Sequence, residues 1–463
     1  MSENTQLSSL EIFLESYPTV KYIQPSSPDY TSARTIFISS NRDTPLAIVQ
    51  PQSPSDVAAL VKYAKSQSIP FTLRCGGHNL EGRSVAQGAL LIDLRTLTDV
   101  SISPDRKSAT VQGGIILEEL GTKLSAEGLC TPIGATPTVG YVGWALYGGY
   151  GSFSSKWGLG VDQILGATVI NPDGEIITAD ESLLEGIRGA GGLFGVIIDL
   201  TIKVYPFASL LAGTILYDST DIATVFVDFN AAHQRLIDSE DIPPELTLQQ
   251  LVVNAPHGRF FGVKFTWSGA DIEEGQRWST KIANLAPALM NTVAVTTIPE
   301  WLAANGALTP DSVYGSAFTH NIKAITPAVA EAIGRSFALM PADPGAMLSI
   351  HQLRGPSAAP QSRPSVFVTR EPHYMVELLG FATRESLKEE SENWAARLFE
   401  DIMRADLGNV LPTCYISLCN TWQAASPAEL LTVLYGTKAE QVRELKKRFD
   451  PDNVFRLTVP VLE

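Results

Sequence analysis

The residues most informative about chemistry are the glycines of one short segment, Gly140 to Gly151. Five of its twelve residues are glycine, and such a density implies positive φ angles and a close approach of the backbone to another group. Exposed backbone N–H groups in such a loop can bind a pyrophosphate. A tight structural turn is the alternative interpretation, so the segment needs support from elsewhere in the chain.

Two further clusters give that support. The first, residues 74–79, reads Arg-Cys-Gly-Gly-His-Asn and directly follows the apolar stretch Phe71 to Leu73. Its glycines free the backbone for contact with an anion, and we expect His78 to be exposed at the end of the turn. A lone histidine is usually structural, but a position beside a phosphate-binding type of loop favours a chemical role. The second cluster, Arg188 to Gly195, runs directly into a predicted strand.

Short helices and strands alternate over residues 1–207 and would position these clusters. A helix is predicted to begin at Ser53, an N-cap residue, with Pro54 in its first position. The turn signal at residues 171–174, Asn-Pro-Asp-Gly, predicts a hairpin. A helix is expected at residues 440–449, stopped by Asp-Pro. Strands are expected at residues 71–73, 90–94, 165–170, 175–178 and 196–204.

The common nucleotide-binding and hydrolase motifs are excluded. A Rossmann fingerprint needs a third glycine that opens a helix, and Ser154 and Phe194 stand at that place in the two candidate segments. The sequence contains no Walker A motif, no H-E-x-x-H and no G-x-S-x-G. The glycine clusters therefore belong to another kind of cofactor site.

Taken together in their order, these motifs resemble the berberine bridge enzyme-like branch of the vanillyl-alcohol oxidase flavoprotein superfamily. The resemblance covers nearly the whole chain, and the ordered set is more specific than any single motif. The matching segments are residues 74–78 (R-x-G-G-H), 132–134 and 137–140 (leading into the glycine-rich loop 143–151), 158–162 (G-L-x-x-D), 188–196 (R-G-x-G-x-x-F-G-V), Phe367 with Arg370 (F-x-x-R), 435–436 (Y-G) and 450–455 (D-P-x-N-x-F).

The resemblance implies an α+β fold and an FAD cofactor. A PCMH-type FAD-binding domain would span residues 1–207 and be completed by the C-terminal segment 420–463, while residues 208–419 would form a substrate domain with an antiparallel sheet covered by helices. In this family the histidine at position 78 bonds covalently to the flavin 8α-methyl group. The expected cofactor-binding residues are Arg74, Cys75, Gly76, Gly77, His78, Asn79, Pro137, Thr138, Val139, Gly140, Gly143, Gly148, Gly149, Gly151, Gly195, Val196 and Asn453.

The chain also departs from the family pattern. Many relatives attach the flavin a second time through a cysteine, and here that position is Thr136. Cys130 lies six residues earlier and is not expected to replace it, so we expect one covalent link, through His78 only. The family's residue at Val139 influences access of oxygen to the flavin, and a small valine resembles the oxygen-reactive members, which favours an oxidase.

The usual general bases are missing from the matching positions. A family tyrosine near the C-terminus corresponds to Leu418, and a family carboxylate on a strand of the substrate domain corresponds to Gln352. Neither side chain accepts a proton near neutral pH. Either the register of this comparison is shifted, or the base comes from elsewhere, or the reaction needs no strong base.

Three residues are candidates to replace the missing base. Tyr415 and Tyr147 are the catalytic candidates, Tyr415 because it lies near the matching C-terminal segment and Tyr147 because it lies within the glycine-rich loop. A structural role is equally open for Tyr415, and Tyr147 could either project toward the substrate or pack in the core. His351 neighbours Gln352, but alternation along a strand should point it to the opposite face.

The composition excludes several classes of protein. The chain has 463 residues, 44% of them hydrophobic, and a formal net charge of −15 without a basic patch, which argues against a nucleic-acid partner. No basic leader or membrane-length apolar run is visible, so we expect no membrane association and a cytoplasmic protein. The four cysteines fit neither a disulfide scaffold nor a common zinc pattern, and no metal is expected.

We therefore expect an FAD-linked oxidoreductase, using molecular oxygen, that acts on a small and largely apolar organic molecule of specialised metabolism. Alcohol oxidation or oxidative ring closure would fit the family. A flavin-containing cyclase or isomerase without net redox change is the alternative, since both usual base positions are lost. A non-catalytic binding protein on the same scaffold is a third reading, against which the retained His78 turn argues. Neither the substrate nor the oligomeric state can be derived from the sequence.

Overall fold

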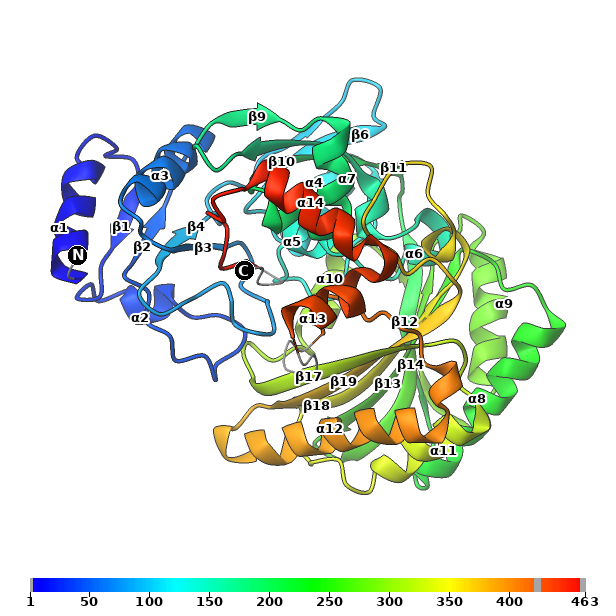
Figure 1. Cartoon of the computed structure of the whole chain (residues 1–463). Coiled ribbons are helices and arrows are strands. Elements are labelled where there is room, and N and C mark those ends of the chain that lie inside the picture. Colours follow the sequence, from blue (N-terminus) through cyan, green and yellow to red (C-terminus); the bar gives the residue numbers. More distant parts are fainter. Residues whose placement is uncertain (1–2, 420–425, 459–463) are drawn as a thin grey trace.

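The structure is a computed structural model that describes residues 3–419 and 426–458. Two sheets with their helices form the part built mainly from the N-terminal half of the chain, and one large sheet forms the other part (Figure 1). The α+β class expected from the sequence is confirmed. Within the described residues, no helix is both long enough and apolar enough to cross a membrane.

The first sheet carries the turn that contains His78. Its strands follow the order β1 (Lys21–Ile23), β2 (Ala47–Gln50), β4 (Leu90–Asp93) and β3 (Phe71–Arg74), and β2, β4 and β3 are parallel. The helices α1 (Glu3–Leu14), α2 (Tyr30–Ala33) and α3 (Pro54–Ser66) belong to the same region. Ser53 Oγ accepts a hydrogen bond from the backbone N–H of Asp56 at 3.2 Å, which confirms the predicted N-cap of α3.

The second sheet is antiparallel and supports the glycine-rich segments. Its strands follow the order β5 (Val100–Ile102), β6 (Ser108–Gln112), β10 (Val196–Lys203), β8 (Ile164–Ile170) and β9 (Ile176–Thr178). The predicted hairpin joins β8 to β9, where the Asn171 Oδ1 atom accepts from the backbone N–H groups of Asp173 and Glu175. The neighbouring elements are α4 (Leu117–Ala126), α5 (Tyr141–Leu146), α6 (Ser154–Trp157), α7 (Glu181–Ala190) and the short pair β7 (Leu129–Cys130) and β11 (Tyr205–Pro206).

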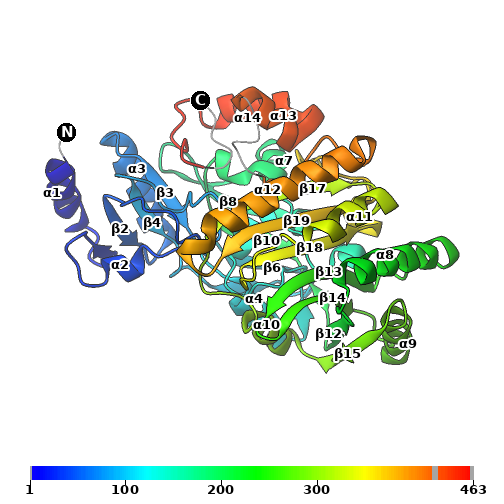
Figure 2. The same cartoon turned by 90° about the horizontal axis from the view of Figure 1, so that it is seen from below.

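The large sheet is entirely antiparallel, as expected. Its strands follow the order β15 (Ala288–Asn291), β12 (Leu210–Tyr217), β14 (Gly258–Trp267), β13 (Leu246–Ala255), β18 (Ala346–Leu353), β19 (His373–Ala382) and β17 (Tyr314–Ile322), with β16 (Ala294–Thr296) also paired to β12. One face is covered by α8 (Ile222–Ser239), α9 (Ile272–Ala283), α11 (Pro327–Ser336) and α12 (Lys388–Ala405). Figure 2 shows α12, α11 and α8 lying along this face.

The opposite face of the large sheet is turned toward the N-terminal part. Leu353 of β18 and Met375 of β19 are buried in the same hydrophobic core as Leu200 of β10. The helix α10 (Ile298–Gly306) packs against α4 between the two parts. The sheet face therefore opposes the region that contains the glycine-rich loop.

The C-terminal helices pack with the N-terminal part of the chain. Val442 of α14 (Ala439–Phe449) lies in the core around β8 and β10, and the Nζ atom of Lys446 donates to the carbonyl oxygen of Leu193 at 3.0 Å. The helix α13 (Pro427–Tyr435) precedes it. The helix predicted at residues 440–449 is confirmed, whereas both limits of the expected segment 420–463 lie outside the described residues.

Candidate active site

The turn at residues 74–79 begins at a buried ion pair, which joins the ends of β3 and β4. At the end of β3, the guanidinium of Arg74 lies 2.6 Å from the carboxylate of Asp93 at the end of β4, and both side chains are inaccessible to solvent. The same guanidinium donates to the carbonyl oxygen of Ala33. The Arg74 side chain thus holds the two strand ends together, and its expected role at the cofactor stays a prediction.

The glycines of this turn bring two distant segments into contact. A Cβ atom on Gly76 would overlap the backbone nitrogen of Gly140 and the carbonyl oxygen of Thr138, and a Cβ atom on Gly140 would overlap the sulfur of Cys75. Gly77 has a φ angle of 72°, which favours glycine. Only glycine therefore allows the two predicted cofactor segments, 74–79 and 137–140, to lie backbone against backbone.

His78 lies half-buried where these two segments meet. Its Nε2 atom is 2.8 Å from Thr138 Oγ1, and its ring stacks on Phe37 with the ring centres 4.6 Å apart. Burial lowers the pKa of the His78 imidazole to about 4, so the ring is neutral at physiological pH. Thr138 engages Nε2, and among the described residues Nδ1 has no hydrogen-bond partner.

The turn continues toward the large sheet. The side-chain oxygen of Asn79 accepts from the backbone N–H groups of Glu81 and Arg83, which closes the loop after His78. A small hollow follows, lined by residues 79–81, by Ala317 of β17 and by residues 416–419. The His78 turn therefore lies next to one end of the large sheet and to the segment that carries Tyr415.

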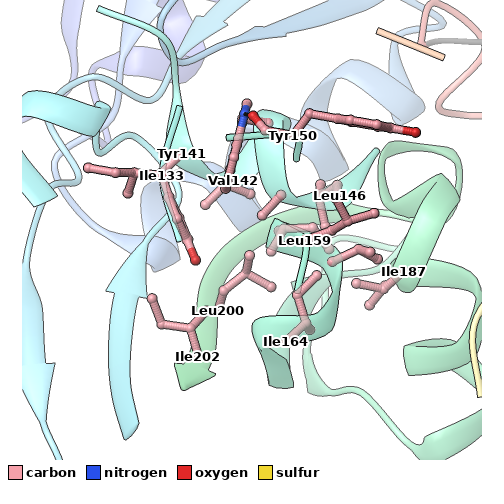
Figure 3. Close-up of a cluster of buried hydrophobic side chains, with 14 of the residues drawn as sticks. Ile133, Tyr141, Val142, Leu146, Tyr150, Leu159, Ile164, Ile187, Leu200 and Ile202 are labelled. Atoms are coloured by element: carbon pink, nitrogen blue, oxygen red, sulfur yellow. Dashed lines mark hydrogen bonds between the residues drawn. The ribbon is translucent and has the colours of Figure 1, made fainter. Parts of the chain in front are cut away.

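Most glycines of the loop 140–151 approach the protein itself. Gly148 has a φ angle of 120°, and a Cβ atom there would lie 2.8 Å from the ring of Phe367. Gly149, with a φ angle of 77°, packs equally closely on Gly160, and Gly151 packs on the carbonyl oxygen of Ile133. Figure 3 shows apolar side chains of the loop, such as Val142 and Leu146, in one buried cluster with side chains from neighbouring elements, such as Ile187. The close approach predicted from the sequence is present, but it fixes the loop on the core.

Gly143 and the later glycine cluster behave differently from each other. Gly143 of α5 is exposed, and a Cβ atom there would have no neighbour within 4 Å, so its surface is open to a ligand. Gly195 is packed against Val169 and the carbonyl oxygen of Ile170, and Val196 is fully buried in β10. Both residues lie where β10 packs against β8, and their expected contact with the cofactor stays a prediction.

Three of the remaining expected cofactor residues, Pro137, Val139 and Asn453, are held in place by backbone hydrogen bonds. The carbonyl oxygens of Pro137 and Val139 accept from the backbone N–H groups of Glu118 and Leu117 at the start of α4. Asn453 follows α14 and has a φ angle of 50°, with its backbone N–H donating to the carbonyl oxygen of Asp450. These contacts set the chain path around the His78 turn and at the C-terminal end of the fold.

The two candidate tyrosines are not brought together. Tyr415 is buried, and its ring centre lies 4.3 Å from that of Tyr150 in the glycine-rich loop. Burial, reinforced by the nearby Glu377 carboxylate, raises the pKa of Tyr415 to about 12. The hydroxyl of Tyr147 lies instead 3.5 Å from Thr458 Oγ1 and against Gly192. Of the two, only Tyr415 therefore lies close to the charged residues of the large sheet.

Gln352 was expected to occupy the family's carboxylate position facing the site, but β18 turns its side chain to the helix-covered face of the sheet. Gln352 donates to the hydroxyl of Tyr374, whose ring lies in the core under the covering helices. His351 points to the opposite face, and its Nε2 atom lies 3.3 Å from Glu377 Oε2 of β19. Adjacent side chains of β18 point to opposite faces, as expected, and His351 is the one that faces the N-terminal part.

Glu377 is the residue that the sequence analysis missed. Its side chain and that of His351 each keep 17% of their surface exposed, so both remain reachable. Burial alone would raise the pKa of Glu377, but His351, Ser349 and Lys264 together hold it below its ordinary value. A carboxylate within the apolar run of residues 374–379 was the signal available in the sequence.

The comparisons with known proteins agree with this geometry. Residues 45–180 match the family model described as an FAD binding domain. An FAD-linked oxidoreductase of Gibberella zeae, aurO, is 30% identical over 453 residues, which are 97% of this chain and 87% of that protein. This chain belongs to the FAD-linked oxidoreductases of the berberine bridge enzyme-like family.

Solved structures show the same fold at lower identity. The 6-hydroxy-D-nicotine oxidase of Arthrobacter nicotinovorans superposes on this FAD-linked oxidoreductase with a TM-score of 0.82 at 22% identity, covering 96% of this chain and 97% of the other. Berberine bridge enzyme gives a TM-score of 0.80 at 20% identity, with 96% and 97% covered. The PCMH-type FAD-binding domain and the antiparallel sheet are therefore confirmed as the family fold.

The residues present suit a bound flavin in this FAD-linked oxidoreductase. The neutral His78 ring keeps one nitrogen unengaged, and the open surface at Gly143 lies on the helix that begins directly after Gly140. Tyr150 Oη and Thr319 Oγ1 are buried without a partner among the described residues, which leaves polar atoms for a ligand. No group of three or more potential metal ligands occurs within residues 3–419 and 426–458.

Proposed function

We propose that this FAD-linked oxidoreductase is an oxidase that carries its flavin covalently on His78 and oxidises a small organic molecule. The observation that supports it best is the neutral His78 imidazole, whose Nε2 is engaged by Thr138. In the tautomer that donates Nε2–H to Thr138, the lone pair of Nδ1 is free for bond formation. Bound FAD supplies the hydride acceptor, and molecular oxygen is the proposed oxidant. The small side chain of Val139 favours oxygen as the partner.

A single covalent link is proposed because neither Cys75 nor Cys130 offers a reactive thiol for a second one. Position 136 is threonine, and Cys75 donates to the carbonyl oxygen of Ile115 at 3.3 Å. Burial raises the pKa of the Cys75 thiol to about 12 and that of Cys130 still further, so both stay protonated and unreactive at neutral pH.

We assign proton transfer to the pair His351–Glu377. The carboxylate lies 3.3 Å from the imidazole Nε2 and can orient it and stabilise its protonated form. Tyr415 lies near this pair, but its raised pKa suits a hydrogen-bond donor better than a base. An available base weakens the cyclase or isomerase alternative, which was motivated by the absence of one.

The proposed substrate carries polar groups. The sequence favoured a largely apolar molecule, but the sheet face turned toward the N-terminal part carries the polar residues Gln249, Ser349, His351 and Glu377. Gln249 donates to Ser349 at 2.9 Å. Burying an apolar molecule against this face would leave polar groups without partners. A small oxygen-bearing molecule of specialised metabolism fits the face better.

We retain the division into residues 1–207, 208–419 and 420–463 as a proposal. It is supported by the strands of the large sheet, which all lie between Leu210 and Ala382, and by the packing of α14 on the N-terminal core. Limited proteolysis of the purified protein would test whether cleavage concentrates at these limits.

Acid precipitation of the purified protein tests the covalent flavin. We expect yellow colour to stay in the pellet of the wild type and to move to the supernatant, or to be absent, in His78→Ala. The control is His257→Ala, which removes an exposed histidine distant in sequence from the turn. Colour released from the wild type would contradict the covalent link, and a colourless wild type would contradict the flavoenzyme.

Anaerobic mixing with candidate substrates separates the two reaction classes. Bleaching of the flavin absorbance would support oxidation, and return of the colour on admission of air would support molecular oxygen as the oxidant. Product formation without any bleaching would favour the non-redox alternative.

A further inference from the structure

A row of polar side chains crosses the large sheet on the face that carries His351. Gln249 of β13 is the register partner of Lys264 on β14 and of His351 on β18. Residues paired in this way project from the same face of a sheet. Lys264, Gln249 and His351 therefore form one line, with Lys264 two strand intervals from His351.

Lys264 is a partly buried cation whose hydrogen-bond partner is neutral. Its Nζ atom lies 2.5 Å from Asn305 Oδ1, and the Asn305 side-chain amide in turn donates to the carbonyl oxygen of Trp301 at 2.7 Å, which fixes the orientation of that oxygen. Within residues 3–419 and 426–458, no carboxylate lies within ion-pair distance of Lys264. Glu377 acts on it only from farther away.

The location of Lys264 connects it to the cofactor segment. Asn305 belongs to α10, and the next residue, Gly306, lies against the ring of Pro137. Pro137 begins the segment that contacts Gly76 and His78. A molecule bound between the sheet face and this segment would meet Lys264 at one end and His351 at the other.

A partly buried ammonium group without an ion-pair partner is costly, and an anion that reaches it lowers the cost. Burial lowers the pKa of Lys264 to about 8, with Glu377 partly opposing the shift, so the group is still mainly charged at pH 7. Neighbouring strands lie roughly 5 Å apart, so Lys264 and His351 stand roughly 10 Å apart along the row.

We propose that Lys264 binds an acidic group of the substrate, a carboxylate or a phenolate, while His351 and Glu377 face the end that is oxidised. This substrate class rests on the proposed oxidase function. The acidic oxygen and the oxidised atom would be separated by roughly 10 Å, the length of an aromatic ring with a short side chain. The Glu377 carboxylate repels the acidic group, so the two charges orient the substrate in one direction.

The test uses two probes of nearly the same shape, of which only one carries a negative charge. The holoprotein is titrated with 3-(4-hydroxyphenyl)propanoate and with the corresponding amide, and binding is followed by perturbation of the flavin absorption spectrum. We expect the carboxylate to bind about 10- to 100-fold more tightly than the amide in the wild type, as expected when a buried charge is paired. The preference should fall to about one in Lys264→Met and persist in part in Lys264→Arg.

The control is Lys447→Met, which removes one exposed positive charge from α14. It should keep the wild-type preference, which would exclude a general effect of net charge. A wild type that does not prefer the carboxylate, or a Lys264→Met variant that keeps the preference, would overturn the proposal. If the protein carried no flavin, the oxidase function would fail separately, and calorimetric titration of the same probes would still decide the role of Lys264.

Discussion

The flavin-side loops and the opposed sheet face contribute different kinds of atoms to the site. In the loops the backbone is decisive, because Gly76 and Gly140 touch without side chains and Gly148 fits under Phe367. On the sheet, side chains from separate strands meet through register, as Glu377 and His351 do. The contacting glycines of the loops therefore tolerate little substitution, whereas the sheet face can change its chemistry without losing the fold.

The largest expected effect is on turnover and comes from changing one charged side chain of the sheet face. Glu377→Gln removes the charge that orients His351 and stabilises its protonated form. We expect turnover to fall about 10²- to 10⁴-fold, the usual contribution of general acid–base catalysis, with the flavin spectrum and the melting temperature nearly unchanged. Rapid-reaction measurement of flavin reduction checks this result directly.

The matched control for that variant is Gln352→Leu. Gln352 faces the covering helices and contacts Tyr374, so its loss should leave flavin reduction within a few-fold of the wild type. If Gln352→Leu slowed reduction as strongly as Glu377→Gln, the assignment of the two faces would be wrong.

A second prediction concerns the backbone contact of the loops. Gly76→Ala would force a Cβ atom into Gly140 and Thr138, and the segments would have to separate. We expect a loss of about 3 kcal/mol in the free energy of unfolding, the upper range for overpacking, together with loss of flavin. Thermal and denaturant unfolding measure the first effect, and absorbance at the flavin band measures the second.

Gly143→Ala tests flavin binding separately from folding stability, at a glycine of the neighbouring loop. A Cβ atom at this position meets nothing within 4 Å, so the free energy of unfolding of the flavin-free protein should be unchanged or slightly higher. Any loss of flavin in this variant would then come from contact with the ligand. Equal destabilisation by both substitutions would contradict the difference between the two glycines.

The same difference explains what the sequence could predict. Gly76, Gly77 and His78 are contiguous, so their spacing is visible in the chain, and the turn, the FAD-binding family and the antiparallel sheet were predicted. Glu377 and His351 are 26 residues apart and meet only because β18 pairs with β19. Without that register, Gln352 was assigned the face that belongs to its neighbour.

The glycine-rich loop shows a second limit of the sequence. Its positive φ angles and close backbone approach were predicted, but a sequence does not say what is approached. Gly148, Gly149 and Gly151 fit against Phe367, Gly160 and Ile133 in the structure. Glycine density therefore indicates a crowded backbone, and the identity of the neighbouring group requires the fold.

Buried histidines of the substrate-side sheet and its helices should make the folding stability of this region decrease at acidic pH. Burial lowers the pKa of His233, His320 and His373 to about 4. The unfolded chain binds protons at these groups from about pH 6.5 downward, whereas the folded protein does so only near pH 4, so stability falls as the pH decreases through this window. Stability is therefore highest above pH 6.5 with respect to these three groups.

The variant His233→Phe measures the contribution of one histidine to this pH dependence of stability. His233 is 4% exposed on α8, and its ring stacks on Phe229. In His233→Phe, the loss of unfolding free energy between pH 7 and pH 5 should be about 2 kcal/mol smaller than in the wild type, following the lowered pKa. Denaturant titrations at the two pH values give this difference, and identical pH dependence would show that His233 does not titrate in that window.

The smallest effect is expected where a loop side chain, instead of the backbone, acts on the cofactor. Thr138→Val removes the hydroxyl 2.8 Å from His78 Nε2 and leaves the backbone contact with Gly76 intact. A hydrogen bond of this kind contributes about 1 kcal/mol, so covalent incorporation of added FAD into flavin-free protein should slow about five-fold and still go to completion. The time course of acid-stable flavin measures it, with Thr136→Val as the control, since no contact joins Thr136 to His78 within the described residues. An unchanged rate in Thr138→Val would mean that the backbone alone positions His78, and the loops would then differ from the sheet face even more sharply than proposed.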